Sequence, residues 1–160
     1  MTILTRIASD VRLMFRRPPR QQYGALCYRL NPETNAVEVL LLTSRDTGRW
    51  VIPKGWPMAD KAAYEVAAQE ALEEAGVLGT VGHDTLGHFD YSKGMKDGFA
   101  VDCRVQVYPL AFEDFAKKYK EKGQRKREWF RFDTAAGKVN EPMLRQIILN
   151  FGRTLTPSPA

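Results

Sequence analysis

The sequence predicts an α/β fold in which a mixed β-sheet lies between helices. Segments with strand and helix character follow one another in the order βββ-α-βββ-α. Hydrophobic residues make up 44% of the 160 residues and charged residues 27%, which is typical of a globular domain. A chain of this length forms one domain and buries a core that needs no disulfide or structural metal.

Strands are predicted where short apolar or β-branched runs are bounded by turn-forming residues. These runs lie at 22–30, 37–43, 50–53, 80–91, 98–110 and 128–132. The turn-forming residues NPETNA between the first two runs indicate a β-hairpin, and the unbroken apolar run 39–42 is typical of a strand covered on both faces. A loop is expected at 54–59, and a lysine-rich loop or short helix at 112–127.

Helices are predicted where apolar residues recur at helical spacing. Residues 1–17 fit a short amphipathic helix, and residues 61–75 fit a longer one that ends at Gly76. Residues 140–151 fit a third helix, with Pro142 in its first turn. The expected organisation is a basic N-terminal arm at 1–20, one domain at 21–152 and a flexible tail at 153–160.

Charge and hydropathy exclude several classes of partner. The formal charge is +5, and residues 1–20 account for most of it, with five arginines against one aspartate. The rest of the chain is close to neutral, so nucleic acid is not an expected partner. No apolar run approaches the roughly 18 residues of a membrane span, and the expected location is cytoplasmic. The arginine-rich start would also suit an organellar transit peptide in a eukaryotic source.

Cysteine and histidine usage restricts the metal chemistry. Cys27 and Cys103 lie far apart without a CxxC motif and are expected in the core. The chain has two histidines, His83 and His88, too few for a histidine-rich metal site. A bound metal would therefore have oxygen ligands, which indicates a hard cation, Mg²⁺ or Mn²⁺.

Three carboxylates crowd one face of the helix expected at 61–75. Glu70, Glu73 and Glu74 are three or four residues apart, so they are neighbours on the helix surface and repel one another. A divalent cation bound by Glu70 and Glu74 would remove that repulsion, and the carbonyl of Gly55 in the preceding loop could complete the oxygen shell. Taken alone, the three glutamates fit a solvated helix face better. The glycine loop before the helix and Gly76 after it reverse that preference.

The segment from Gly55 to Val77 resembles the Nudix box of the Nudix (MutT-like) hydrolases, GX5EX7REUXEEXGU, where U is aliphatic. Six positions match in register: Gly55, Glu70, Glu73, Glu74, Gly76 and Val77. Two positions depart from the pattern, because Lys61 replaces its first Glu and Gln69 replaces its Arg, and Ala71 is small for an aliphatic position.

The resemblance implies a Nudix-type α/β/α sandwich that hydrolyses a diphosphate linkage by in-line attack of water, with Mg²⁺ or Mn²⁺ as the cofactor. It implies that Glu70, Glu74 and the carbonyl of Gly55 bind the metal and that Glu73 is the catalytic base. Lys61 cannot bind a metal, whereas Gln69 can still donate a hydrogen bond to a neighbouring glutamate.

The expected substrate is an anionic phosphorylated small molecule. The run Trp50–Trp56 resembles the diphosphoinositol polyphosphate phosphohydrolase branch, and basic side chains suit such a substrate. The candidate substrate-binding residues are Arg45, Lys54, Lys93, Arg125 and Arg127. Diphosphoinositol polyphosphate or dinucleoside polyphosphate is the leading substrate, and a nucleoside diphosphate sugar such as ADP-ribose is the alternative. A catalytically silent module that binds nucleotide or nucleic acid is the alternative from another class, and a homodimer stays open.

Overall fold

The computed structural model describes residues 17–156, which form eight strands and three helices. The strands are β1 (Arg20–Leu30), β2 (Val37–Thr43), β3 (Trp50–Val51), β4 (Lys54–Gly55), β5 (Val77–Val81), β6 (Gly87–Gly94), β7 (Ala100–Phe115) and β8 (Arg127–Arg131). The helices are α2 (Ala63–Ala75), α3 (Phe132–Lys138) and α4 (Pro142–Leu155). Apart from Arg17, the helix expected at 1–17 lies outside the described residues, as does the end of the tail at 157–160.

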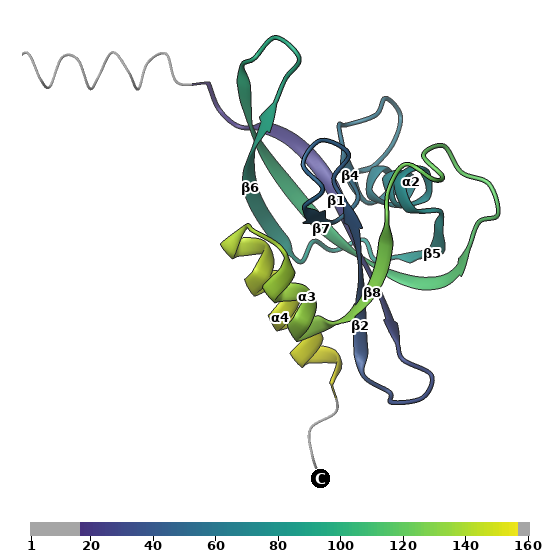
Figure 1. Cartoon of the computed structure of the whole chain (residues 1–160). Helices are drawn as coiled ribbons and strands as arrows, with labels where there is room; N and C mark the ends of the chain where they lie inside the picture. Colours follow the sequence, from purple (N-terminus) through teal and green to yellow (C-terminus); the bar gives the residue numbers. More distant parts are fainter. Residues whose placement is uncertain (1–16, 157–160) are drawn as a thin grey trace, which may run out of the picture.

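Strand β1 is the centre of one mixed sheet (Figure 1). It pairs in parallel with β7, from Arg20 opposite Cys103 to Tyr28 opposite Ala111. It pairs antiparallel with β2 and, at Tyr23 and Gly24, with β4. Strands β3 and β8 extend the sheet from β2, and β5 and β6 pair with different parts of β7. The mixed sheet predicted from the sequence is confirmed.

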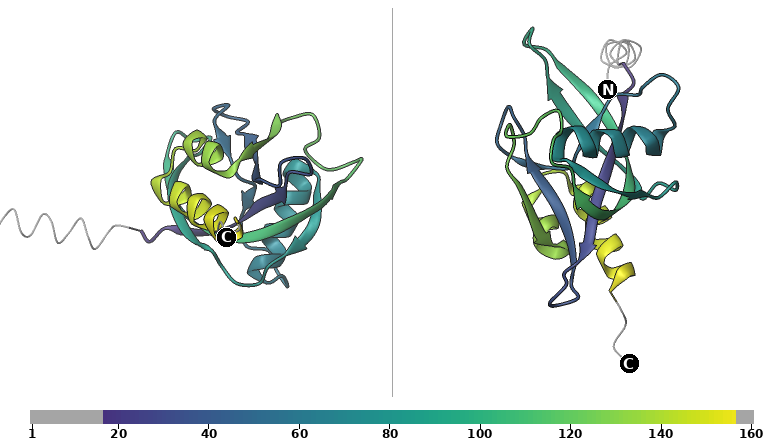
Figure 2. Two further views of the ribbon diagram at one scale, coloured as in Figure 1. Left: turned by 90° about the horizontal axis from the view of Figure 1, so that it is seen from below. Right: turned by 90° about the vertical axis from the view of Figure 1, so that its right-hand side faces the viewer.

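Helices cover both faces of this sheet, because alternate residues of a strand point to opposite faces. On β1, Ala25 and Cys27 pack with the cluster beneath α2, whereas Leu26 between them packs with the cluster beneath α3 and α4. Figure 2 shows α2 on one side of the strands and the α3–α4 pair on the other. The predicted sandwich of helix, sheet and helix is therefore confirmed, and both cysteines lie in the core as expected.

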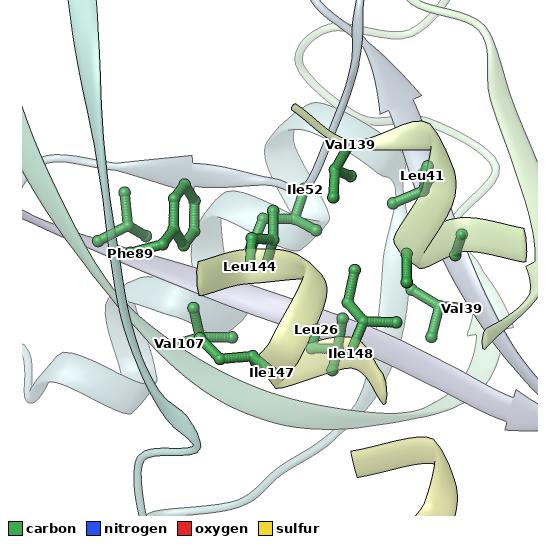
Figure 3. Packing of buried hydrophobic residues seen from close by; sticks show 13 residues of the cluster. Leu26, Val39, Leu41, Ile52, Phe89, Val107, Val139, Leu144, Ile147 and Ile148 are labelled. Atoms are coloured by element: carbon green, nitrogen blue, oxygen red, sulfur yellow. The ribbon is translucent and has the colours of Figure 1, made fainter. Parts of the chain in front are cut away.

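The two faces differ in the size of the side chains that fill them. Under α4, Leu144, Ile147 and Ile148 contact a core that contains Leu26 and Val39 (Figure 3). Each such side chain contributes about 1.5–3 kcal/mol when it is fully buried. Under α2, the helix residues in the cluster include the small Ala67, Ala71 and Ala75, so the helix axis can lie close to the sheet. This close approach brings the polar side chains of α2 to the neighbouring strand β4.

The ends of α2 and α4 follow from their terminal residues. Gly76 after α2 has φ 69°, a left-handed conformation that glycine adopts without a steric penalty, and its N–H donates to the Leu72 carbonyl at 2.9 Å. This is the C-cap that the sequence predicted. Helix α4 starts with Pro142 in its first turn, also as predicted, and it continues to Leu155, beyond the expected end at residue 151.

The prediction of one strand at 80–91 is wrong. Strand β5 ends at Val81 and β6 begins at Gly87, because two short strands pair in succession with the long strand β7. Between them the chain passes Pro109 of β7, where the Gly82 N–H donates to the Pro109 carbonyl at 2.8 Å. Gly87 has φ 134°, a conformation that residues with a Cβ rarely adopt.

Three further elements differ from the sequence-based expectation. Strand β4 lies in the segment expected to be loop, β7 runs to Phe115 instead of ending near residue 110, and α3 was not predicted. The two-residue β4 is defined by its pairing with Tyr23 and Gly24, which are distant in sequence. Among residues 17–156, no helix has both the length and the apolar character that crossing a bilayer requires.

The contact between α3 and α4 leads to a stability prediction. A Cβ at Gly152 of α4 would overlap the ring of Phe132, so Gly152→Ala should lower the free energy of unfolding by about 1–3 kcal/mol. Gly137 of α3 has open space where its Cβ would be, so Gly137→Ala should be neutral or stabilising by up to about 1 kcal/mol. Urea unfolding of both variants checks this, and an equal effect of the two substitutions would contradict the packing.

Candidate active site

The backbone of β4 lies directly against a carboxylate of α2. A Cβ at Gly55 would overlap the carboxylate of Glu70, so no other residue fits at position 55 unless Glu70 moves. Glu74, one helical turn after Glu70, contacts the same strand, because the Lys54 N–H donates to Glu74 Oε2 at 3.4 Å. The structure therefore brings Gly55, Glu70 and Glu74, three of the residues singled out in the sequence, to one place.

Both carboxylates resist ionisation in this position. Burial raises the pKa of Glu74 to about 8, against the opposing effects of the Arg125 and Lys54 charges. Burial, and then the charge of Glu73, also raises the pKa of Glu70, although a hydrogen bond to Glu74 acts in the other direction. Two glutamates that share a hydrogen bond at the edge of the core form a place where a cation would replace a proton.

The donor set fits a hard divalent cation. Glu70 and Glu74 offer carboxylate oxygens, and the adjacent Gly55 backbone could add a carbonyl oxygen. Within residues 17–156 no group of three or more His, Cys, Asp or Glu side chains is arranged to hold a metal, so water or substrate would have to complete the shell. Mg²⁺ commonly binds in this way, through one or two carboxylates together with waters and substrate phosphates.

Glu73 occupies the neighbouring position on α2. Its carboxylate is half-buried and accepts a hydrogen bond from Gln69 Nε2 at 3.0 Å. Gln69 thus makes the kind of hydrogen bond expected of it, without a positive charge. Lys61, before the helix, is exposed.

Two cationic residues, Lys54 and Arg125, lie close to the paired carboxylates, and Arg45 lies beyond Arg125 at Glu121. Lys54 Nζ lies 4.9 Å from the centre of the Tyr91 ring. Burial lowers its pKa, and the nearby Glu74 charge partly restores it. Arg125 Nη2 lies 3.9 Å from Glu74 Oε1 and 3.2 Å from Glu121 Oε1, which also lies 3.2 Å from Arg45 Nη1.

The other two candidate cations have different surroundings. Lys93 Nζ lies 5.4 Å from the centre of the ring of Trp56, the residue after Gly55. The pKa of Lys54 is lowered mainly by burial and raised in part by the charges of Glu74 and Glu141, and the positive charges of Arg125 and Lys93 lower it further. Arg127 is not brought to the carboxylates. Its guanidinium stacks over Phe115 at 3.8 Å and donates to the Ala75 carbonyl at the end of α2.

Two charged residues that sequence reasoning passed over also lie here. Arg20 stacks over the Trp56 ring at 4.8 Å, a position that follows from sheet pairing and has no local signal. Glu121 is 9% exposed. A signal for it existed, because it is the one acidic residue among seven lysines and arginines between 117 and 127.

A separate cavity of about 630 Å³ opens beside the start of β1, and none of the candidate ligand residues lines it. Its walls include Pro18, Pro19 and Asp102, together with Arg104, which forms a two-bonded ion pair with Asp90 at 2.9 and 3.2 Å. The candidate ligands therefore lie at the α2–β4 contact, outside this cavity.

Comparison with known proteins shows which sequences and folds the chain resembles. No family model matches the chain. The chain is 32% identical over 119 residues to the Bos taurus diphosphoinositol polyphosphate phosphohydrolase 3-beta, covering 72% of this chain and 66% of the relative. It is 29% identical over 116 residues to the Arabidopsis thaliana Nudix hydrolase 16, mitochondrial, covering 71% and 64%. The chain thus spans slightly less than two thirds of the length of these curated relatives.

Solved structures share the fold. The Caenorhabditis elegans (C. elegans) Ap4A hydrolase has a TM-score of 0.61 at 19% identity, covering 87% of this chain and all of that chain. The Nudix domain of Shewanella oneidensis NrtR, solved with ADP-ribose, has a TM-score of 0.63 at 15% identity, covering 98% and 100%. At these identities the likeness establishes the architecture alone.

The raised pKa of Glu74 predicts a stability that depends on pH when no metal is present. In the unfolded chain the pKa of a glutamate is about 4.3, so between that value and about 8 the folded protein keeps a proton that the unfolded chain has released. The contribution of Glu74 to stability should therefore be complete below about pH 4.3 and should fall as the pH rises towards 8, by about 1.36 kcal/mol for each unit of pKa difference.

Thermal unfolding in EDTA at about pH 5 and about pH 8 checks this prediction. The midpoint should drop further for the wild type than for Glu74→Gln, which has no proton to lose, and Mg²⁺ should reduce the drop in the wild type. Equal drops in both proteins would show that Glu74 ionises normally.

Proposed function

Because the chain belongs to the Nudix hydrolase family, we propose that it is a metal-dependent hydrolase that cleaves a diphosphate linkage in a phosphorylated small molecule. The observation that carries the proposal is the contact of Glu70 and Glu74 with the β4 backbone. Burial raises the pKa of both glutamates, and Gly55 leaves room for the carboxylate of Glu70. Such carboxylates are expected to bind a divalent cation and not to stay as solvated negative charges.

Each residue of the site has a role in the proposed reaction. Glu70, Glu74 and the Gly55 carbonyl would hold Mg²⁺ or Mn²⁺, which would supply neutralising charge for the phosphates and would lower the pKa of a bound water. Glu73, oriented by Gln69, accepts the proton of the attacking water. The water oxygen bonds to phosphorus as the bridging P–O bond breaks, and the second phosphate leaves with the bridging oxygen. Lys54 and Arg125 stabilise the negative charge on the phosphate oxygens.

The proposed substrates carry several phosphates. Support comes from the cations near the carboxylates, and from the relatives and neighbours named for diphosphoinositol polyphosphate and Ap4A. Lys93 and Arg45 extend the positive surface outward from Lys54 and Arg125. A nucleoside diphosphate sugar stays the alternative, since the NrtR domain was solved with ADP-ribose.

A catalytically silent module is the rival from another class. Lys61 favours it, since the family pattern has a glutamate there, whereas the paired carboxylates favour an enzyme. A cytoplasmic location stays a prediction, and three plant relatives carry the word mitochondrial in their names.

Removing the charge of either metal-binding glutamate should abolish most activity. Glu70→Gln and Glu74→Gln should each lower kcat/KM by roughly 10²-fold or more, because a neutral amide binds Mg²⁺ weakly and leaves the phosphate charge without compensation. Phosphate release with Mg²⁺ should be measured on diphosphoinositol polyphosphate, Ap4A and ADP-ribose. Glu128→Gln, an exposed glutamate of β8, is the matched control and should behave like the wild type.

The same assay separates the rivals. Hydrolysis of one of the three substrates by the wild type, lost in both glutamine variants, supports the enzyme. Near wild-type turnover of either variant at saturating Mg²⁺ refutes the ligand assignment. A wild-type protein that binds nucleotide but hydrolyses none of the three with Mg²⁺ or Mn²⁺ would identify the silent module.

A further inference from the structure

Glu121 is a buried carboxylate that has no part in the reaction as proposed above. It lies in the segment 116–126 between β7 and β8 and is 9% exposed. Its backbone ties this segment to the active-site helix, because the Glu121 N–H donates to the Glu73 carbonyl at 2.9 Å. The Gln124 N–H in turn donates to the Glu121 carbonyl at 3.0 Å, which fixes the turn that leads to Arg125. The position of Glu121 is thus set relative to α2.

One oxygen of Glu121 contacts two guanidinium groups. Arg45 Nη1, from the segment after β2, and Arg125 Nη2, from the same segment as Glu121, each lie 3.2 Å from Glu121 Oε1. The Arg125 side chain is 11% exposed, and its Nη1 also donates to the Thr43 carbonyl at 3.2 Å. Its Nε is buried and makes no hydrogen bond within residues 17–156. The guanidinium is therefore held in place through its two terminal nitrogens, by the Thr43 carbonyl and by Glu121.

Arg125 also lies close to a proposed metal ligand. The distance from Arg125 Nη2 to Glu74 Oε1 is 3.9 Å, so the guanidinium and a metal ion would compete for Glu74 and repel each other. The nearer carboxylate of Glu121 offers Arg125 a different partner. Arg125 can then stay beside the site without taking Glu74 away from the metal.

We propose that Glu121 is a positioning residue that holds Arg125, together with Arg45, next to the paired glutamates of α2 and so keeps Glu74 available for the divalent cation. This inference rests on the proposed function, since it concerns the same site. It assigns Glu121 a role through the arginines and not as a direct ligand.

Direct binding of Mn²⁺, followed by electron paramagnetic resonance of the free ion, tests the proposal without relying on activity. In Glu121→Gln, Arg125 loses its partner and pairs with Glu74, so Mn²⁺ affinity should fall about 10-fold, the usual effect of removing a partner of a metal ligand. In an Arg125→Gln background no guanidinium competes at Glu74. In that background, Glu121→Gln should lower Mn²⁺ affinity by about threefold or less, because only the electrostatic attraction between the Glu121 charge and the ion is lost.

The controls separate positioning from ligation and from general loss of stability. Glu38→Gln is the matched control, because Glu38 pairs with Arg29 at 2.9 Å near the opposite end of β2 from Thr43, and it should leave Mn²⁺ affinity unchanged. Unfolding in EDTA establishes that the variants are folded. If Glu121→Gln does not fold, Glu121→Asp replaces it, since aspartate keeps the negative charge but its shorter side chain cannot contact both arginines in the same way. Glu121→Asp should also lower Mn²⁺ affinity relative to the wild type.

The outcomes are distinct. An affinity loss that largely disappears in the Arg125→Gln background supports the positioning role. An equal loss in both backgrounds overturns it in favour of Glu121 as a direct ligand, and unchanged affinity in Glu121→Gln overturns it while the proposed function stands. Absence of Mn²⁺ binding by the wild type would overturn the proposed metal site and the positioning role together.

Discussion

The close approach of α2 to strand β4 is the contact on which the rest of the site depends. Glu70 can lie against position 55 because that residue is glycine, and α2 can lie so low because small alanines face the sheet. A larger side chain at either place would separate the carboxylates from the β4 backbone. The packing of the core on this face and the chemistry of the site therefore have the same cause.

The central strand β1 contacts both the glycine strand β4 and the two core clusters beneath the helices. Strand β4 is held by its pairing with Tyr23 and Gly24 of β1, and the β1 residues that follow, Ala25 and Cys27, lie in the core beneath α2. On the opposite face, Leu26 anchors the α3–α4 layer. A change in β1 would move both the glycine strand and the helix that carries the glutamates, so the geometry of the site is coupled to the stability of the whole sheet.

Charge balance around the carboxylates comes from segments that are far apart in the sequence. Lys54 precedes the glycine, Arg45 follows β2, and Arg125 comes from the segment before β8. Glu121 places a negative charge between the two arginines. This alternation of signs allows Glu121 and Arg125 to stay ionised although both side chains are largely buried, which isolated charges could not do.

The sequence by itself determined the elements whose signals are local. Periodicity located β1, β2, α2 and α4, Gly76 marked the end of α2, and the i, i+4 spacing placed Glu70 and Glu74 on one helix face. These features depend on neighbouring residues, and the motif between Gly55 and Val77 also carried the family resemblance. The resemblance also led to the expectation that Gln69 donates a hydrogen bond to a neighbouring glutamate, and the structure shows this acceptor to be Glu73.

Tertiary structure alone decided what depends on contacts between distant segments. The split into β5 and β6 follows from pairing with β7, and β4 is a strand only because it pairs with β1. Arg127 contacts the end of α2 and the Phe115 ring and does not contact the paired glutamates. Glu121 lay in a lysine-rich run that is typical of a solvated loop, yet it is buried between two arginines. A local pattern records the charge of such a residue, whereas its burial and partners are set by the folding of other segments against it.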